Sequence, residues 1–176
     1  MNKIVQFAII LPTISVMVVS MLLANLGIER YVAAVAGDPL YTPTQSDLNA
    51  ALNADSFDAP VYVVRDGIVS YRVGRTGGNP VGAVFVLSKT AWNPGLVYLV
   101  GVDANGYISG VQIIQHNETP GFWAMVAEAG FYRDLEGNTA GMVFHAVSGA
   151  TRTSYTIYSG AHNAVRYFIR YIRPTL

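Results

Sequence analysis

A run of 25 residues without Asp, Glu, Lys or Arg, residues 4–28, places the strongest constraint on how this chain folds. As an α-helix it would extend about 37 Å at ~1.5 Å per residue, which exceeds the ~30 Å hydrocarbon core of a bilayer. Charged residues make up only 12% of the chain, well below the ~25% typical of soluble domains. The sequence therefore predicts one N-terminal transmembrane helix within residues 1–29.

A cleaved signal peptide is the competing interpretation, because Ala34 and Ala36 form the small-x-small pattern of a cleavage site. The apolar run is long for the core of a signal peptide, which favours a retained anchor. Lys3 precedes the run, whereas Glu29 and Arg30 cancel each other directly behind it. By the positive-inside rule we expect a single-pass protein of the cytoplasmic membrane with its folded domain on the extracytoplasmic side.

The rest of the chain is predicted to divide into a linker and one domain. Residues 30–59 contain Pro39 and Pro43 among polar residues, and we expect a linker with one short helix around 45–54. Residues 60–176 are expected to form the domain. The chain has no cysteine, which excludes disulfides, thiolate catalysis and cysteine-ligated metal or iron–sulfur sites. A net charge of zero without a basic cluster in the sequence argues against a nucleic-acid partner.

Two hairpins and one further strand dominate the first part of the domain. Asp66-Gly67 separates two β-rich runs, which is a strong signal for a tight hairpin. A second hairpin is expected to turn at residues 104–106. The strand between them contains Gly82, which indicates a close approach of two backbones.

Two helices are expected after the strands. One is short and begins near Phe122, and the other covers residues 153–172. The second carries apolar residues at three- and four-residue spacing along one face: Ile157, Ala161, Ala164, Val165, Phe168 and Ile172. The predicted class is α+β, with one transmembrane helix and a mainly antiparallel sheet flanked by helices.

The stretch HAVSGATRTSY, residues 145–155, places small residues and hydroxyl groups at the start of the final helix. A helix N-terminus presents unpaired N–H groups and a partial positive charge, and both attract phosphate. Small residues would let a bulky anion approach the backbone at Gly149 and Ala150. Hydroxyl donors are available from Ser148, Thr151, Thr153 and Ser154. Alternatively, Thr153 or Ser154 simply caps the helix and nothing binds there.

The stretch HNETPGFW, residues 116–123, is the second informative pattern. A tight turn with exposed backbone N–H groups is predicted for Glu118, Thr119, Pro120 and Gly121. Two aromatic side chains follow at once, and exposed backbone beside aromatic rings suits a flat heteroaromatic ligand. An ordinary turn capped by Thr119, with both rings in the core, is the alternative.

Together the two stretches resemble the FMN-binding domain family, found in the G subunit of the Rnf electron-transport complex. The same family includes the C subunit of the sodium-pumping NADH:quinone oxidoreductase. The matching pieces are an N-terminal anchor, VGAVF, VGVDANGYISGVQI, HNETPG and SGATRTS, in this order. Beyond the anchor, order and spacing agree from about residue 60 to 168, and HxETPG thirty residues upstream of SGATxTS is a specific combination. A length of 176 residues suits the Rnf protein better than the longer quinone-oxidoreductase protein.

The resemblance implies that FMN is joined through its phosphate to Thr151, the threonine of SGAT, in a phosphoester bond. A separate flavin transferase makes that bond in the family. The remaining cofactor-binding residues implied are Ser148, Gly149, Ala150, Thr153, Ser154, Glu118, Thr119, Pro120 and Gly121. Two positions depart from the family pattern. His145 stands where an acidic residue is usual, and Phe122 stands where a leucine usually follows ETPG.

We therefore expect a membrane-anchored subunit that relays electrons through covalent FMN, with the bilayer and other subunits of an Rnf-type complex as partners. No residue is arranged as a general base or a hydride-orienting acid, and no metal site is predicted. Two other classes stay open, namely a flavin-free extracytoplasmic interaction module and an anchored flavin reductase that acts on a small acceptor.

Overall fold

A computed structural model describes residues 41–176, so the predicted transmembrane helix and residues 30–40 of the predicted linker lie outside the described residues. None of the helices found in residues 41–176 has the length and apolarity that a membrane crossing requires.

A six-stranded antiparallel sheet forms the centre of the domain, which confirms the expected class of sheet. Neighbouring strands follow the order β1-β3-β4-β5-β6, and β2 also pairs with β3. The strands are β1 (Ser56–Phe57), β2 (Val61–Arg65), β3 (Ile68–Thr76), β4 (Asn79–Lys89), β5 (Leu96–Asp103) and β6 (Ile108–Gln115). Because consecutive strands from β2 to β6 are neighbours, short turns suffice to build most of the sheet.

The turns lie where the sequence predicts them. Asp66 and Gly67, between β2 and β3, both have positive φ, 56° and 85°, as a tight hairpin turn requires. In the turn between β5 and β6 the carboxylate of Asp103 accepts hydrogen bonds from the backbone N–H groups of Asn105 and Tyr107, each at 2.9 Å. A Cβ added to Gly82 would lie 2.2 Å from the carbonyl oxygen of Val102, so the predicted close approach is confirmed.

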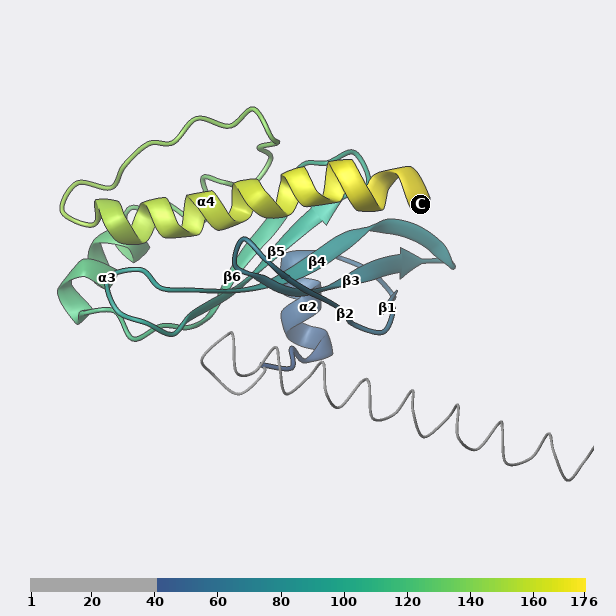
Figure 1. Cartoon of the computed structure of the whole chain (residues 1–176), viewed down its shortest axis with the longest axis horizontal. Helices are drawn as coiled ribbons and strands as arrows, with labels where there is room; N and C mark the ends of the chain where they lie inside the picture. The colour runs from purple at the N-terminus through teal and green to yellow at the C-terminus, as the bar shows by residue number, and fades with distance from the viewer. Residues whose placement is uncertain (1–40) are drawn as a thin grey trace, which may run out of the picture.

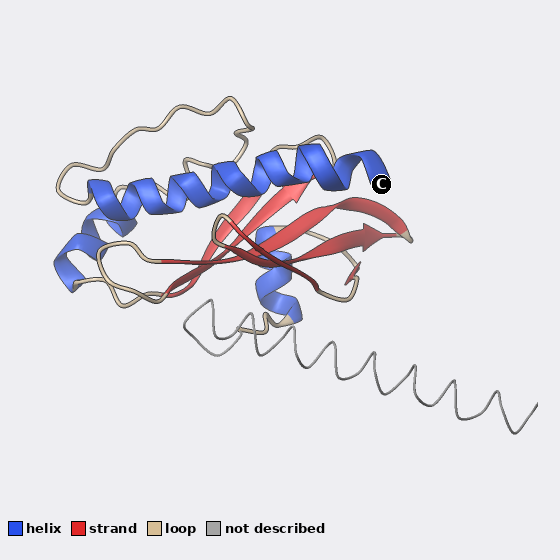
Figure 2. Ribbon diagram, viewed as in Figure 1, coloured by secondary structure: helices blue, strands red, loops and turns tan. Residues whose placement is uncertain are grey.

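Helices cover both faces of this sheet (Figures 1 and 2). The short helix α2 (Gln45–Ala51) lies on one face, and the long helix α4 (Thr151–Tyr167) crosses the other. The chain continues from α4 as one π-helical segment (Phe168–Ile172) and a 3₁₀ turn (Arg173–Thr175). The helix α3 (Pro120–Glu128) lies at the end of the domain where α4 begins.

Helix α2 confirms the short helix expected around residues 45–54. A capping box of Thr44 and Asp47 starts it. Its C-terminal end sits almost on the sheet, since a Cβ added to Gly101 would lie 2.0 Å from the carbonyl oxygen of Ala51. The hydroxyl of Ser109 donates to that same oxygen at 2.7 Å. This part of the predicted linker therefore packs on the strands, while the proposed boundary at residue 60 stays a prediction.

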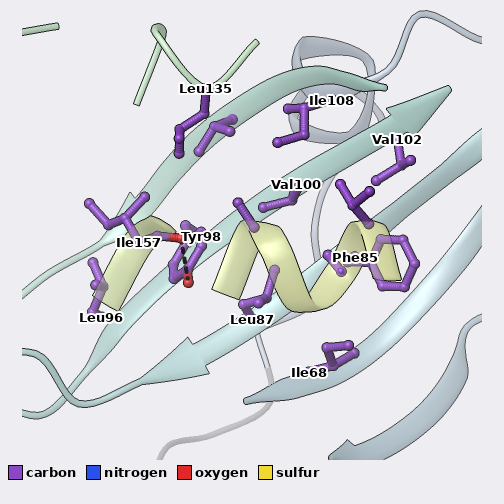
Figure 3. Close-up of a cluster of buried hydrophobic side chains, with 14 of the residues drawn as sticks. Ile68, Phe85, Leu87, Leu96, Tyr98, Val100, Val102, Ile108, Leu135 and Ile157 are labelled. Atoms are coloured by element: carbon purple, nitrogen blue, oxygen red, sulfur yellow. Dashed lines mark hydrogen bonds between the residues drawn. The ribbon is translucent and has the colours of Figure 1, made fainter. Parts of the chain in front are cut away.

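The main core lies between α4 and the strands (Figure 3). Every residue predicted for the apolar face of the last helix is buried: Ile157, Ala161, Ala164, Val165, Phe168 and Ile172. Tyr98 of β5 is fully buried, and its hydroxyl donates to the carbonyl oxygens of Thr156 and Ile157, at 3.1 and 3.4 Å. Burial raises the pKa of this phenol, so it remains a hydrogen-bond donor throughout the physiological range.

Both later helices begin two residues before their predicted starts. Helix α3 begins at Pro120, so the predicted tight turn is wrong there, because Thr119 occupies the N-cap position and proline the first helical position. Helix α4 begins at Thr151 with Ala150 at the N-cap position, so Thr153 and Ser154 are not caps. Residues 142–147, between the two helices, form no strand.

Gly160 in the middle of α4 offers a test of this packing. A Cβ added there would lie 1.8 Å from the hydroxyl oxygen of Tyr98 and 2.8 Å from Cδ2 of Leu87. Alanine is a better helix former than glycine by up to ~1 kcal/mol, yet overpacking typically costs about 1–3 kcal/mol. We expect Gly160→Ala to lower the free energy of unfolding, measured by urea titration in detergent.

The double variant Tyr98→Phe/Gly160→Ala is the control, because it removes the oxygen that the new methyl group would meet. Gly160→Ala should cost less in the Tyr98→Phe background than in the wild type. A stabilising effect of Gly160→Ala alone would contradict the close contact.

Candidate functional site

The two motifs singled out in the sequence lie side by side, at the starts of α3 and α4. They are joined by a hydrogen bond from the hydroxyl of Thr153 to Oε2 of Glu118. The bond links residues 35 positions apart in the sequence. The structure thus brings together HNETPG and SGATRTS, the two most specific stretches of the resemblance.

Glu118 holds this region together. Its side chain is only 5% exposed. Besides the bond from Thr153, it accepts from the backbone N–H of Asn93 at 2.8 Å and from that of Trp92 at 3.4 Å. A buried carboxylate is costly unless donors surround it, and hydrogen bonds to an ionised acceptor are roughly twice as strong as neutral ones. One carboxylate therefore fixes three segments: the β4–β5 loop, the residues before α3, and the first turn of α4.

The N-terminus of α4 has no side-chain cap and no acidic residue in its first turn. Thr153 is committed to Glu118, and the hydroxyl of Ser154 donates to the carbonyl oxygen of Ala150 at 3.1 Å. That hydroxyl also accepts from the backbone N–H of Val147 at 3.3 Å. The hydroxyl groups of Thr153 and Ser154 thus form hydrogen bonds within the protein. The first N–H groups of the helix are the donors that no side chain satisfies.

Unlike Thr153 and Ser154, which are buried, Thr151 and Ser148 are exposed. The Thr151 hydroxyl makes only one long contact, 3.5 Å to the carbonyl oxygen of Val147. Between them, Gly149 has a positive φ of 80°, and a Cβ added there would lie 2.7 Å from the sulfur of Met125. The backbone conformation therefore favours glycine at this position, while the contact with Met125 involves only the end of a flexible side chain.

A mostly apolar pocket of about 290 Å³ opens beside Thr151. Its lining combines residues 149–153 with Trp92 and Phe122. The two rings meet edge to face, with centroids 5.6 Å apart, and the guanidinium of Arg152 lies 5.7 Å from the centre of the Trp92 ring. Trp92 remains 55% exposed, so a further flat group could pack against it.

The remaining predicted residues lie near this pocket without lining it. Thr119, Pro120 and Gly121 are exposed in the first turn of α3, and a Cβ added to Gly121 would meet no atom within 4 Å. Phe122 is the residue of that motif that faces the pocket. Ala150, which does line the pocket, is itself buried.

Sequence reasoning missed Trp92 and Arg152. Trp92 lies in a loop with no recognisable motif, and the bond from its backbone N–H to Glu118 and its ring contact with Phe122 bring it to the site. Arg152 occupies the unspecified position of SGATxTS, but a cation beside a possible phosphate site could have drawn attention to it.

Two histidines near the motifs lie away from this pocket. His116 stacks on Trp123 with ring centroids 3.9 Å apart, on the other side of the α3 start from Phe122. His145 is exposed in the loop before α4. In the part of the chain that the structure describes, no three His, Asp or Glu side chains gather as a metal-binding group.

The comparisons with known proteins agree with the motifs. The model of the family described as FMN-binding domain matches residues 92–166. The G subunit of the ion-translocating oxidoreductase complex of Methanosarcina acetivorans is 28% identical over 109 residues, 57% of this chain and 58% of the relative. The G subunit of the Na(+)-translocating ferredoxin:NAD(+) oxidoreductase complex of Acetobacterium woodii is 29% identical over 112 residues, 54% of this chain and 53% of the relative.

The chain thus spans little more than half the length of these relatives. The matched region contains Trp92, the ETPG residues and the SGAT residues. Residues 92–166 therefore match the model of the FMN-binding domain family that the two motifs resemble, and the resemblance to the G subunit of Rnf-type complexes is confirmed.

Proposed function

We propose that this chain is a membrane-anchored flavoprotein subunit of an Rnf-type ion-translocating oxidoreductase complex. It relays electrons through FMN that is bound covalently, through the phosphate, to Thr151. The family model and the two related G subunits support an electron-transfer flavoprotein of this kind. The covalent bond to Thr151 and the membrane anchor are further parts of the proposal, beyond what the family model and the relatives support.

The observation that carries the proposal is the contrast between Thr151 and Thr153. Thr151 presents an exposed hydroxyl at an uncapped helix N-terminus beside an apolar pocket. Thr153 is 1% exposed and bonded to Glu118. Only a hydroxyl that a transferase can reach could accept the phosphate, which supports Thr151 as the attachment residue.

The residues around Thr151 suit both ends of FMN. The phosphoester keeps one negative charge, which the free N–H groups of the first turn of α4 and the guanidinium of Arg152 would stabilise. Trp92 and Phe122 would contact the ring system, which is flat and largely apolar. A covalent tether would keep the flavin at the site even if these contacts alone bind it modestly.

Bound FMN would supply the redox chemistry, and the protein would position the group and tune it. No side chain lining the pocket is a carboxylate, histidine or lysine that could act as a general base on a soluble substrate. A relay between neighbouring cofactors fits this lining better than a flavin reductase does. We propose the other membrane and redox subunits of the complex, the lipid bilayer and a maturing flavin transferase as partners.

A flavin-free interaction module, or a part resembling the C subunit of a quinone oxidoreductase, would differ in measurable ways. The mass of the intact chain after expression with the transferase tests the flavin-free alternative, since covalent FMN adds its mass to that of the polypeptide. An unmodified mass would contradict the proposal.

Thr151→Ala should abolish the flavin fluorescence of the denatured protein on a gel. The fold should survive, because the side chain is exposed and does not cap the helix, and such a loss usually changes stability by less than ~0.5 kcal/mol. Ser148→Ala, which removes an exposed hydroxyl three residues earlier, is the matched control and should keep the fluorescence. Covalent flavin in Thr151→Ala would show that another residue carries the group.

Glu118→Gln should lower the free energy of unfolding by about 1–3 kcal/mol, because an NH₂ group would face at least one of the buried donors. Urea titration measures the change. Glu128→Gln, at an exposed carboxylate of α3, is the control and should stay within ~0.5 kcal/mol of the wild type. Equal stability of the two variants would remove Glu118 from its structural role.

Topology can be tested with one introduced thiol, because the chain has no cysteine. Glu136 lies exposed in the loop that follows α3. We expect the cysteine of Glu136→Cys to react with a membrane-impermeant reagent in intact spheroplasts, since the domain is proposed to lie outside the cytoplasm. Reaction only after lysis would reverse the orientation.

A further inference from the structure

A second hollow lies at the opposite end of α4 from Thr151. It is small, about 130 Å³, and lies between the β2–β3 turn and the C-terminal part of the helix. Arg65 reaches it from β2, and Arg166 and Arg170 reach it from the helical side. We refer to this hollow as the arginine groove. Arg166 lies fifteen residues beyond Thr151, about 22 Å along the helix, so the groove is separate from the flavin pocket.

The arginine groove has an excess of positive charge. Asp66 is the one carboxylate that lines it, against three guanidinium groups. Its closest approach to Arg65 is 3.5 Å, and both side chains are 61% exposed. Among the described residues, neither Arg166 nor Arg170 forms an ion pair within 4 Å. Two arginines thus face the groove without a carboxylate partner.

The helix alone explains part of this arrangement. The partial negative charge at a helix C-terminus favours cations in the last turns, which accounts for Arg166 and Arg170. It does not account for Arg65, which comes from a strand about one hundred residues earlier and approaches from the other side. Cations from two elements thus line one hollow, and an anion bound there would reduce the repulsion between them.

Contacts with Tyr171 restrain two of these side chains, Arg65 and Arg170. The guanidinium of Arg170 lies 5.4 Å from the centre of the Tyr171 ring, and Arg65 Nη1 donates to the Tyr171 hydroxyl at 3.5 Å. Tyr167 packs against Tyr171, with ring centroids 4.8 Å apart, and against Phe85 at 6.2 Å. Side chains restrained in this way lose less freedom when a ligand binds.

We propose that the arginine groove binds a phosphate group through Arg65, Arg166 and Arg170. Guanidinium groups match phosphate oxygens in geometry and charge, and a hollow of this size admits a phosphate or phosphodiester rather than a nucleotide. The group could come from the headgroup of an anionic phospholipid or from phosphate in solution. This inference does not depend on FMN at Thr151.

The test uses the full chain in a neutral detergent and three soluble probes. They are inorganic phosphate, dihexanoyl phosphatidylglycerol and dihexanoyl phosphatidylcholine, each titrated by isothermal calorimetry. We expect saturable binding of phosphatidylglycerol that weakens by about tenfold or more in Arg166→Gln/Arg170→Gln. Arg133→Gln, at an exposed arginine near α3, is the matched control and should bind as the wild type does.

The probes separate the two sources of the group. Binding of phosphatidylglycerol but not of inorganic phosphate assigns the groove to a lipid headgroup, and binding of inorganic phosphate assigns it to phosphate chemistry in general. The proposal is overturned if neither binds, or if the double variant binds as tightly as Arg133→Gln. Binding of either lipid that stays unchanged in the double variant would also overturn it, since acyl chains rather than the arginines would then hold the lipid.

Discussion

The buried carboxylate of Glu118 is the interaction on which the arrangement of this domain's pocket depends. It is enclosed by two backbone N–H groups of the β4–β5 loop and the hydroxyl of Thr153. An ionised group in such a place is stable only while all of these donors remain. Three segments therefore depend on one another for their positions. They are the β4–β5 loop with Trp92, the start of α3, and the start of α4. The apolar pocket is the space that these three segments leave between them.

The long helix α4 connects two regions of different chemistry. Its N-terminus offers unpaired N–H groups beside aromatic rings, and its C-terminal part presents arginines opposite Arg65. The middle of the helix is clamped to the sheet, because the hydroxyl of Tyr98 occupies the space that a side chain at Gly160 would need. Neither end can shift along the sheet without disturbing that contact. Both regions therefore keep a fixed position relative to the strands (Figure 1).

The parts of this fold that depend on local pattern could be predicted from the sequence. Asp66-Gly67 encodes its own turn, and the spacing of Ile157, Ala161 and Phe168 encodes a buried helical face. Both helix starts are predicted two residues late. Helix α3 begins directly after Thr119, and helix α4 begins directly after Ala150, which is not one of the hydroxyl residues expected as a cap. Contacts between distant segments could not be predicted. Neither the approach of Trp92 to the SGAT residues nor that of Arg65 to Arg166 leaves a signal in a single sequence.

The same geometry explains why two threonines of one motif have different roles. Successive residues of an α-helix are about 100° apart, so positions two residues apart point in nearly opposite directions. The bond from Thr153 to Glu118 sets the rotation of the first turn, because Thr153 must face the interior to make it. Thr151 must then face outward, beside the pocket and the free N–H groups of the helix. A buried carboxylate that never touches the proposed attachment oxygen thus determines which hydroxyl is presented.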